Sequence, residues 1–158
     1  MSATHRYETC LVWTGNRGAG TSAYDAYDRD WDVRADGRDA LRGSADPAFR
    51  GDASRHNPED LLVASLSSCH MLWYLHLAAE AGIVVTRYED RAVGEMVTHR
   101  GGAGEFVSVT LRPRITIAKG GDPEAARALN ERAHELCFIA RSVNFAVLCE
   151  PQIVFDAG

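Results

Sequence analysis

The segment from residue 58 to residue 81 constrains the fold of this chain more than any other. Asn57 is a favourable N-cap, Pro58 suits the first helical position, and Gly82 supplies a C-terminal stop, so these boundaries predict one long helix. Apolar residues cover nearly every face of that helix. A helix of this kind has to be surrounded by other protein. We therefore expect it to form the core of the fold.

A membrane span of the same length is disfavoured by the polar residues inside the segment. Ser65, Ser67, Ser68, His70 and His76 interrupt it, and its flanks lack the basic and aromatic residues that anchor a span. The N-terminus also lacks a basic segment followed by an apolar one, so no secretory signal is evident. These observations predict a cytoplasmic protein without a membrane association.

Composition agrees with a single globular domain over residues 1–158. The chain has 158 residues, of which 46% are hydrophobic, and this is enough for a substantial core. Its formal net charge is -5, and no basic run or stripe is present to neutralise phosphates. Binding to nucleic acid is therefore not expected.

The remaining pattern alternates between strand-like and helical segments. Asp122 and Pro123 repeat the N-cap and first-turn signature and predict a second helix. Glycines at 101, 102 and 104 predict a hairpin turn, and residues 35–57 form a predicted loop. The predicted strands are residues 7–14, 21–33, 83–96, 106–117 and 147–155. The order β-β-α-β-β-α-β is typical of an α+β fold with an antiparallel sheet against helices.

Two of the four cysteines lie in the two predicted helices. Cys69 follows Ser67 and Ser68 in the apolar helix, and Cys137 lies near the end of the second helix. The wide spacing of the four cysteines is unlike that of a small disulfide scaffold. Cys69 and Cys137 therefore suggest a thiol redox pair, whereas Cys10 and Cys149 lie in strand-like stretches and are interpreted as structural.

Three short motifs together resemble the OsmC/Ohr family of osmotically inducible and organic hydroperoxide resistance proteins. They are Asn57-Pro-Glu-Asp-Leu-Leu, Cys69-His, and Ala133-His-x-x-Cys137. The resemblance implies an intertwined homodimer in which antiparallel sheets wrap around long central helices. It also implies a thiol-dependent peroxidase that reduces organic hydroperoxides without a cofactor or a metal.

The resemblance assigns roles to individual residues of this chain. It implies that Cys69 is the peroxidatic thiol, Cys137 the resolving thiol and Glu59 an acidic partner. It also implies that Arg17 is the arginine that stabilises the thiolate, with Arg29 as a rival. An external dithiol, either a lipoyl protein or a thioredoxin-like protein, would recycle the disulfide. The motifs do not separate the OsmC branch from the Ohr branch.

One local departure from the family concerns the resolving thiol. Many relatives follow the second cysteine with Pro and place a Ser two residues further on. Here Phe138, Ile139 and Ala140 follow Cys137. The departure affects the expected geometry at this thiol more than the expected fold.

Helix geometry places a constraint on the predicted site. Glu59 and Cys69 are ten positions apart, which corresponds to about 15 Å along a straight helix. Either the helix breaks between them, or Glu59 reaches Cys69 of a second subunit across a two-fold interface. We favour the second possibility and predict a site composed from both subunits of a homodimer.

Two functions other than a peroxidase, and a zinc site, use the same residues. A Cys-His hydrolase would use Cys69 as its nucleophile, but His70 faces elsewhere on the helix and no orienting carboxylate is evident. A zinc site is disfavoured because adjacent helical positions point about 100° apart and no Cys-x-x-Cys occurs. A non-enzymatic redox sensor or small-ligand-binding dimer remains an alternative.

Overall fold

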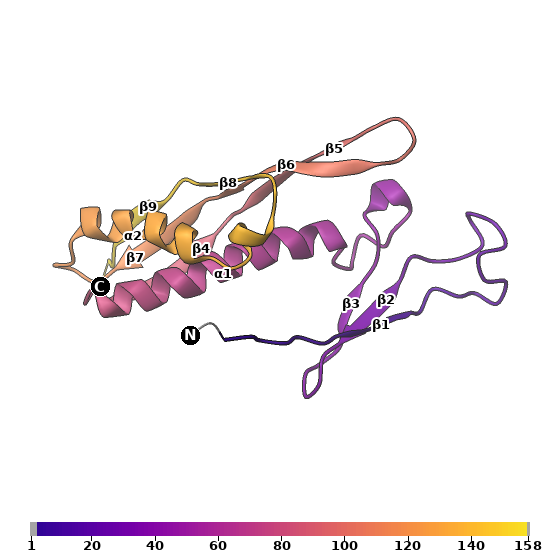
Figure 1. Cartoon of the computed structure of the whole chain (residues 1–158), viewed down its shortest axis with the longest axis horizontal. Helices are drawn as coiled ribbons and strands as arrows, with labels where there is room; N and C mark the ends of the chain where they lie inside the picture. The colour runs from indigo at the N-terminus through magenta and orange to yellow at the C-terminus, as the bar shows by residue number, and fades with distance from the viewer. Residues whose placement is uncertain (1–2, 158) are drawn as a thin grey trace. The chain divides into compact units, whose positions relative to one another are not determined.

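A computed structural model describes residues 3–157 and shows a mixed α+β chain (Figure 1). The helices are α1, Pro58–Glu80, and α2, Pro123–Leu136, with short 3₁₀ helices at Pro47–Phe49 and Ala140–Ser142. The described residues divide into two compact units, one ending at Leu61 and the other beginning at Leu62.

The first unit contains a small antiparallel sheet. Its strands are β1, Cys10–Trp13, β2, Trp31–Arg34, and β3, Leu41–Gly43, in the order β1-β2-β3. The predicted strand at 21–33 was mostly wrong, because only its last three residues are in β2. The preceding residues form a loop, and the Asn16 side chain holds its start by accepting bonds from Gly18 and Gly20. Strand β3 lies in the stretch that was predicted to be a loop.

The second unit holds two three-stranded sheets. Their orders are β4-β7-β9 and β5-β6-β8. The strands are β4, Val85–Asp90, β5, Val93–Thr98, β6, Gly104–Leu111, β7, Pro113–Ile117, β8, Ala146–Cys149, and β9, Gln152–Phe155. Each of the three long strands predicted for this region is therefore split into two, and its halves belong to different sheets.

The breaks between the split strands have local causes. Pro151 has no N–H for a ladder bond, so it interrupts the hydrogen-bond ladder between β8 and β9. At Arg112 the backbone N–H donates to the Asp90 carboxylate at 2.7 Å instead of to a neighbouring strand. The predicted hairpin turn between β5 and β6 is confirmed, because the two strands pair antiparallel and Gly101 and Gly102 have positive φ.

The expectation of a purely antiparallel sheet was wrong. Strand β4 pairs antiparallel with β7, and β5 pairs antiparallel with β6, but β6–β8 and β7–β9 are parallel. The reason is the position of α2 in the chain. A helical crossover returns the chain to the end at which the earlier strand began, so the following strands run in the same direction.

Both helices begin where the sequence predicts. The Asn57 side chain accepts a 2.7 Å bond from the Asp60 N–H, and the Asp122 side chain accepts from Glu124 and Ala125. These bonds satisfy N–H groups that have no partner within the helix. Helix α1 then runs unbroken to Glu80, one residue short of the predicted end, and Gly82 has the positive φ of a helix stop.

Only one stripe of α1 is buried within the described chain. It consists of Leu66, His70, Tyr74 and Ala78, which recur every four residues. Leu72 on another face is 63% exposed. By length and composition alone, α1 could also cross a membrane. The core helix of a water-soluble protein passes the same test. Within the described part of the second unit, α1 is therefore covered along one stripe and not on all sides.

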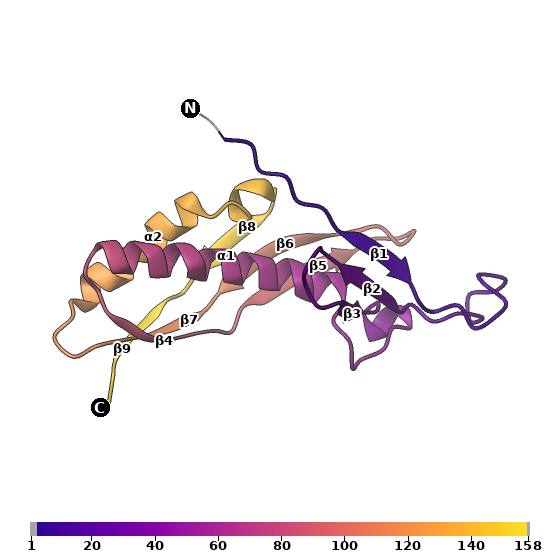
Figure 2. The same cartoon turned by 90° about the horizontal axis from the view of Figure 1, so that it is seen from below.

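The buried stripe of α1 joins two apolar clusters in the second unit. Leu66 packs in one cluster with Val109 and Leu111 of β6. Tyr74 and Ala78 pack in the other, and its remaining buried members are Ile83, Ile115, Ile117, Ala126 and Ala133. Figures 1 and 2 both show α2 alongside the C-terminal half of α1, over the sheets. The elements that carry Cys69 and Cys137 are thus attached to one core.

Truncation of Leu66 tests this description of the core. Leu66 is fully buried, so Leu66→Ala is expected to lower the free energy of unfolding by about 2–5 kcal/mol. Val84→Ala is the control, because Val84 is 61% exposed, and its expected effect is within about 0.5 kcal/mol. Urea denaturation followed by circular dichroism measures both. Equal losses in the two variants would contradict the assignment.

Candidate functional site

The fold brings Cys69 and Cys137 together, although they are far apart in the sequence. Cys69 lies half-buried in α1, and Cys137 is the C-cap of α2 with 1% exposure. Both thiols are free. Burial raises the pKa of Cys137 to about 11, and the neighbouring Cys69 thiol contributes to the same increase. The second contribution requires the two side chains to lie within interaction range.

The residues after Cys137 wrap around its sulfur. The Ala140 N–H donates a 3.4 Å hydrogen bond to Cys137 Sγ, and the backbone of Ile139 also lowers the thiol pKa. These N–H groups favour the thiolate but do not offset the loss of hydration. Phe138 is 65% exposed and packs edge-on against Trp73. The stretch that departs from the family pattern therefore forms a backbone cradle for this thiol.

A second group of predicted residues lines a cavity of about 410 Å³ in the first unit. Arg29 and Glu59 both line it. Its other lining residues are mainly aromatic or small, and include Trp13, Tyr27, Trp31, Ser44, Asp46 and Phe49. An apolar wall with a few charged groups is typical of a site for an organic molecule.

The Arg29 guanidinium is held firmly at this cavity. It donates to the backbone oxygens of Tyr24 and Tyr27, both at 2.6 Å. The same group stacks on the two rings, 4.4 Å and 4.2 Å from their centroids. Cation–π contacts of this kind leave the charge in place while they orient the plane of the group. Arg29 is therefore a preorganised positive charge.

Glu59 has an unsatisfied oxygen at the same cavity. Its Oε2 atom is buried and has no hydrogen-bond partner among the described residues. A buried carboxylate oxygen normally accepts at least one bond, and leaving it without one costs about 1–3 kcal/mol or more. The structure thus presents an acceptor that a donor from outside this unit would satisfy.

Arg17 does not line the cavity. Its side chain is 52% exposed, donates to the Asp25 backbone oxygen, and lies 3.6 Å from the Asp28 carboxylate. The structure therefore places Arg29, the rival in the sequence prediction, beside the same cavity as Glu59. Sequence reasoning could not separate the two arginines, because both lie in a loop whose path depends on contacts rather than on a periodic pattern.

Helix α1 contains no break between Glu59 and Cys69. Their ten-residue separation therefore corresponds to about 15 Å along the axis. One of the two alternatives from the sequence, a broken helix, is excluded. The predicted residues form two groups, a thiol pair in the second unit and an arginine-carboxylate group in the first.

A buried polar cluster next to Cys69 was not predicted from the sequence. His70 Nε2 lies 3.2 Å from Asn130 Oδ1, and Cys149 Sγ lies 3.8 Å from each of these atoms. Burial, with smaller contributions from Asp90 and Glu150, raises the pKa of Cys149 to about 12. An asparagine between Ala126 and Ala133 on the apolar face of the second helix was the signal that could have indicated it.

This cluster does not have the geometry of a Cys-His-Asn hydrolase site. In such a site the cysteine and the asparagine contact opposite nitrogens of the imidazole. Here Cys149 and Asn130 both approach Nε2, and Nδ1 is buried without a partner among the described residues. The high pKa of Cys149 also disfavours a nucleophilic thiolate. Within residues 3–157, no group of three or more His, Cys, Asp or Glu is arranged to hold a metal ion.

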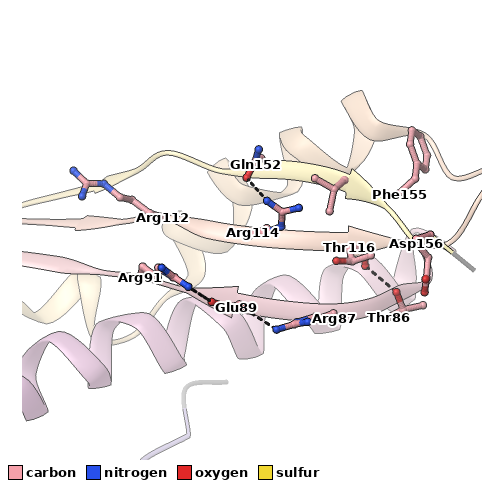
Figure 3. Close-up of a pocket in the computed structure, with 12 residues that line it drawn as sticks. Thr86, Arg87, Glu89, Arg91, Arg112, Arg114, Thr116, Gln152, Phe155 and Asp156 are labelled. Atoms are coloured by element: carbon pink, nitrogen blue, oxygen red, sulfur yellow. Dashed lines mark hydrogen bonds and ion pairs between the residues drawn. The ribbon is translucent and has the colours of Figure 1, made fainter.

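A broad cavity of about 860 Å³ lies on the exposed face of the β4-β7-β9 sheet, and its lining residues include no cysteine (Figure 3). Its charged lining is Arg87, Glu89, Arg91, Arg112, Arg114 and Asp156. Arg87 and Arg91 both bind Glu89, and Arg114 donates to Gln152. Most of these side chains satisfy one another on the sheet surface, so the cavity is a solvated ionic network.

Solved structures of other proteins have a similar fold. An OsmC-like protein of unknown function from Vibrio cholerae is 29% identical, with a TM-score of 0.85 over 94% of this chain and 99% of that chain. An organic hydroperoxide resistance protein from Elizabethkingia anophelis is 18% identical, with a TM-score of 0.69 over 99% and 100%. An organic hydroperoxide resistance protein OsmC from Legionella pneumophila is 18% identical, with a TM-score of 0.67 over 96% and 98%.

No curated protein matches the chain in sequence. The model of the family described as OsmC-like protein matches residues 51–151, a range that includes α1, α2 and both thiols of the pair. That range is well over half of the chain. The chain therefore belongs to the OsmC-like protein family.

Proposed function

We propose that this protein is a cytoplasmic, homodimeric thiol peroxidase that reduces organic hydroperoxides. The observation that carries the proposal is the close approach of Cys69 and Cys137, one half-buried and one fully buried. Two similar structures are named as organic hydroperoxide resistance proteins, which supports the same substrate class. The chemistry needs only the two thiols and an external dithiol, so no cofactor is required.

The reaction would run in three balanced steps. The Cys69 thiolate attacks an oxygen of the hydroperoxide, an S–O bond forms as the O–O bond breaks, and the alcohol leaves. The Cys137 sulfur then attacks Cys69, an S–S bond forms as the S–O bond breaks, and water leaves. A lipoyl protein or a thioredoxin-like dithiol finally reduces the disulfide by exchange.

Arg29 and Glu59 would complete the site from the partner subunit. A guanidinium beside Cys69 would stabilise its thiolate, and the Glu59 carboxylate would be the acidic partner there, its free oxygen accepting a hydrogen bond from the second chain. The unbroken α1 prevents Glu59 from approaching Cys69 of its own chain. The unsatisfied Glu59 oxygen and the aromatic lining of the same cavity are consistent with a site that a second chain completes.

The incomplete burial of α1 also supports a homodimer. Apolar side chains outside the buried stripe remain accessible, with Leu72 at 63% exposure. A soluble protein rarely leaves a long apolar face uncovered. A two-fold contact between the α1 helices of two subunits would cover it with the same surface of each chain.

A redox sensor is the second candidate function, and the pKa of Cys137 favours it. A thiol with a pKa near 11 is almost fully protonated at neutral pH, so resolution by its thiolate is slow. An oxidised Cys69 would then persist long enough to act as a signal. Steady turnover with a dithiol reductant would support the peroxidase, and a single oxidation without turnover would support the sensor.

Substitution of the two thiols tests the proposed roles. Cys69→Ser is expected to abolish reduction of cumene hydroperoxide, because no other thiol replaces the nucleophile. Cys137→Ser is expected to permit one oxidation and to leave a sulfenic acid on Cys69 that dimedone traps. Cys10→Ser is the control, because Cys10 is exposed on β1, and full activity is expected. Mass spectrometry and a peroxide assay measure these outcomes, and an unmodified Cys69 in the wild type would reject the proposal.

The rate of disulfide formation should depend on pH in a defined direction. The pKa of Cys137 is raised to about 11, so its thiolate fraction rises about tenfold per pH unit between pH 7 and 9. Conversion of the Cys69 sulfenic acid to the disulfide is therefore expected to accelerate over this interval. Stopped-flow mixing with one equivalent of hydroperoxide, followed by acid quench, measures it. A rate that does not change with pH would show that Cys137 is not the attacking group.

Matched substitutions of the two arginines test which one serves Cys69. Arg29→Ala is expected to lower kcat/KM by about 10²-fold or more, the usual cost of losing one preorganised charge at a reacting group. Arg17→Ala is the control and is expected to change kcat/KM less than about threefold, because Arg17 bonds only within its own exposed loop. A larger loss of kcat/KM in Arg17→Ala than in Arg29→Ala would instead assign the role to Arg17.

Mixed dimers distinguish a composite site from a site within one chain. Arg29→Ala and Cys69→Ser subunits are each expected to be inactive as homodimers. When they are refolded together in equal amounts, half of the dimers contain both, and each of those has one complete site, so activity should return to about a quarter of the wild type. No recovery in a sample that contains mixed dimers would contradict the composite site.

A further inference from the structure

The two helices that carry the thiols are joined by buried polar bonds. His70 Nε2 on α1 lies 3.2 Å from Asn130 Oδ1 on α2. One turn further along α1, the Tyr74 hydroxyl donates a 2.9 Å bond to the backbone oxygen of Ala126, one turn earlier on α2. The helices are therefore antiparallel at this contact, and both views show them side by side (Figures 1 and 2).

The His70–Asn130 bond is fully enclosed and has a fixed direction. His70 is 1% exposed and Asn130 is 3% exposed. The Asn130 amide nitrogen donates to the Arg127 backbone oxygen at 3.0 Å, which orients Oδ1 toward α1. His70 Nε2 therefore donates, and Nδ1 is the buried nitrogen without a partner in the described chain. A polar pair enclosed in this way tolerates little displacement, because separation would leave both groups unsatisfied.

This bond joins the two helices that carry the redox thiols. His70 directly follows Cys69, and Cys137 comes seven residues after Asn130, about 10 Å further along α2. Ala133, which is fully buried in the same core, lies between Asn130 and Cys137. A shift of α2 relative to α1 would therefore change the distance between the two sulfurs.

We infer that His70 and Asn130 are positioning residues that hold Cys137 at bonding distance from Cys69. In the closing step the Cys137 sulfur attacks the sulfur of the Cys69 sulfenic acid, the S–S bond forms, the S–O bond breaks and water leaves. That step needs the two cysteines within the narrow range that a disulfide allows. The first step, attack of Cys69 on the organic hydroperoxide, does not. The use of this positioning in catalysis rests on the proposed peroxidase, whereas the positioning of the two thiols itself does not.

The role of the pair is tested through disulfide closure without any peroxide. The oxidant is diamide. One thiolate adds to its N=N bond, and the second thiol then attacks the sulfur of that adduct. The S–S bond forms as the S–N bond breaks, and the hydrazine leaves. Mass spectrometry of the 69–137 peptide pair gives the closure rate. The protein is also equilibrated with mixtures of reduced and oxidised dithiothreitol. The fraction that carries the 69–137 disulfide gives the effective concentration of Cys137 at Cys69.

Two substitutions of Asn130 separate the bond from the shape of the side chain. Asn130→Leu keeps the size but removes the acceptor, and closure is expected to be about 10- to 100-fold slower, with a similar fall in effective concentration. Asn130→Asp keeps the oxygen that accepts from His70, and closure within about threefold of the wild type is expected. If both variants close at the wild-type rate, or if both are equally slow, the inferred role is wrong.

Tyr74→Phe is the control for a purely structural effect. It removes the other buried bond between the same two helices, one turn further from the thiols. A lower melting temperature with closure within about threefold of the wild type is expected. If Tyr74→Phe slows closure as much as Asn130→Leu, the effect is a general loss of helix packing and the inference fails.

A peroxide measurement keeps this inference separate from the proposed function. In Asn130→Leu, dimedone trapping should show Cys69 oxidised by cumene hydroperoxide at the wild-type rate, with a sulfenic acid that persists. If Cys69 of the wild type does not react with hydroperoxide but diamide closure still responds to Asn130, the peroxidase proposal fails and the positioning role stands. If Cys69 reacts normally with hydroperoxide and the rate of disulfide closure is unchanged in Asn130→Leu, only the positioning role fails.

Discussion

The unbroken course of α1 is the constraint on which the rest of the site depends. A continuous helix from Pro58 to Glu80 places Glu59 near one end and Cys69 about 15 Å along it, and no side chain spans that distance. The same helix buries one stripe and leaves other apolar positions, such as Leu72, exposed. Both properties support the proposed homodimer, in which a second subunit would cover the apolar face and supply the charged group to the thiol.

The two thiols differ in burial, and burial changes the pKa of Cys137. Cys137 is enclosed, and desolvation raises its pKa to about 11 although backbone N–H groups surround the sulfur. Cys69 is half-buried and lies beside it. The buried thiol is thus mostly protonated at neutral pH, and its position depends on the packing of α2 against α1. The His70–Asn130 bond belongs to that packing, and a buried pair of this kind is specific because an imperfect alignment is costly.

The elements with strong local signals were predicted well, and the others were not. Both helix starts were correct because Asn57 and Asp122 cap them through bonds within a few residues. The antiparallel sheet was wrong, because strand direction follows from the crossover through α2, a long-range property. The strand expected before Trp31 is a loop whose aromatic residues hold Arg29, so a β-like composition there reflects a cavity wall.

The sequence by itself determined the two capped helices, the family motifs, and the presence of one thiol on each helical segment, because these depend on neighbours along the chain. Only the tertiary structure decided that Cys69 and Cys137 lie together and that Arg29 shares a cavity with Glu59. It also decided that His70 and Asn130 join the two helices next to the thiols. These contacts link residues up to 68 positions apart, and which of them form depends on how the helices and sheets pack.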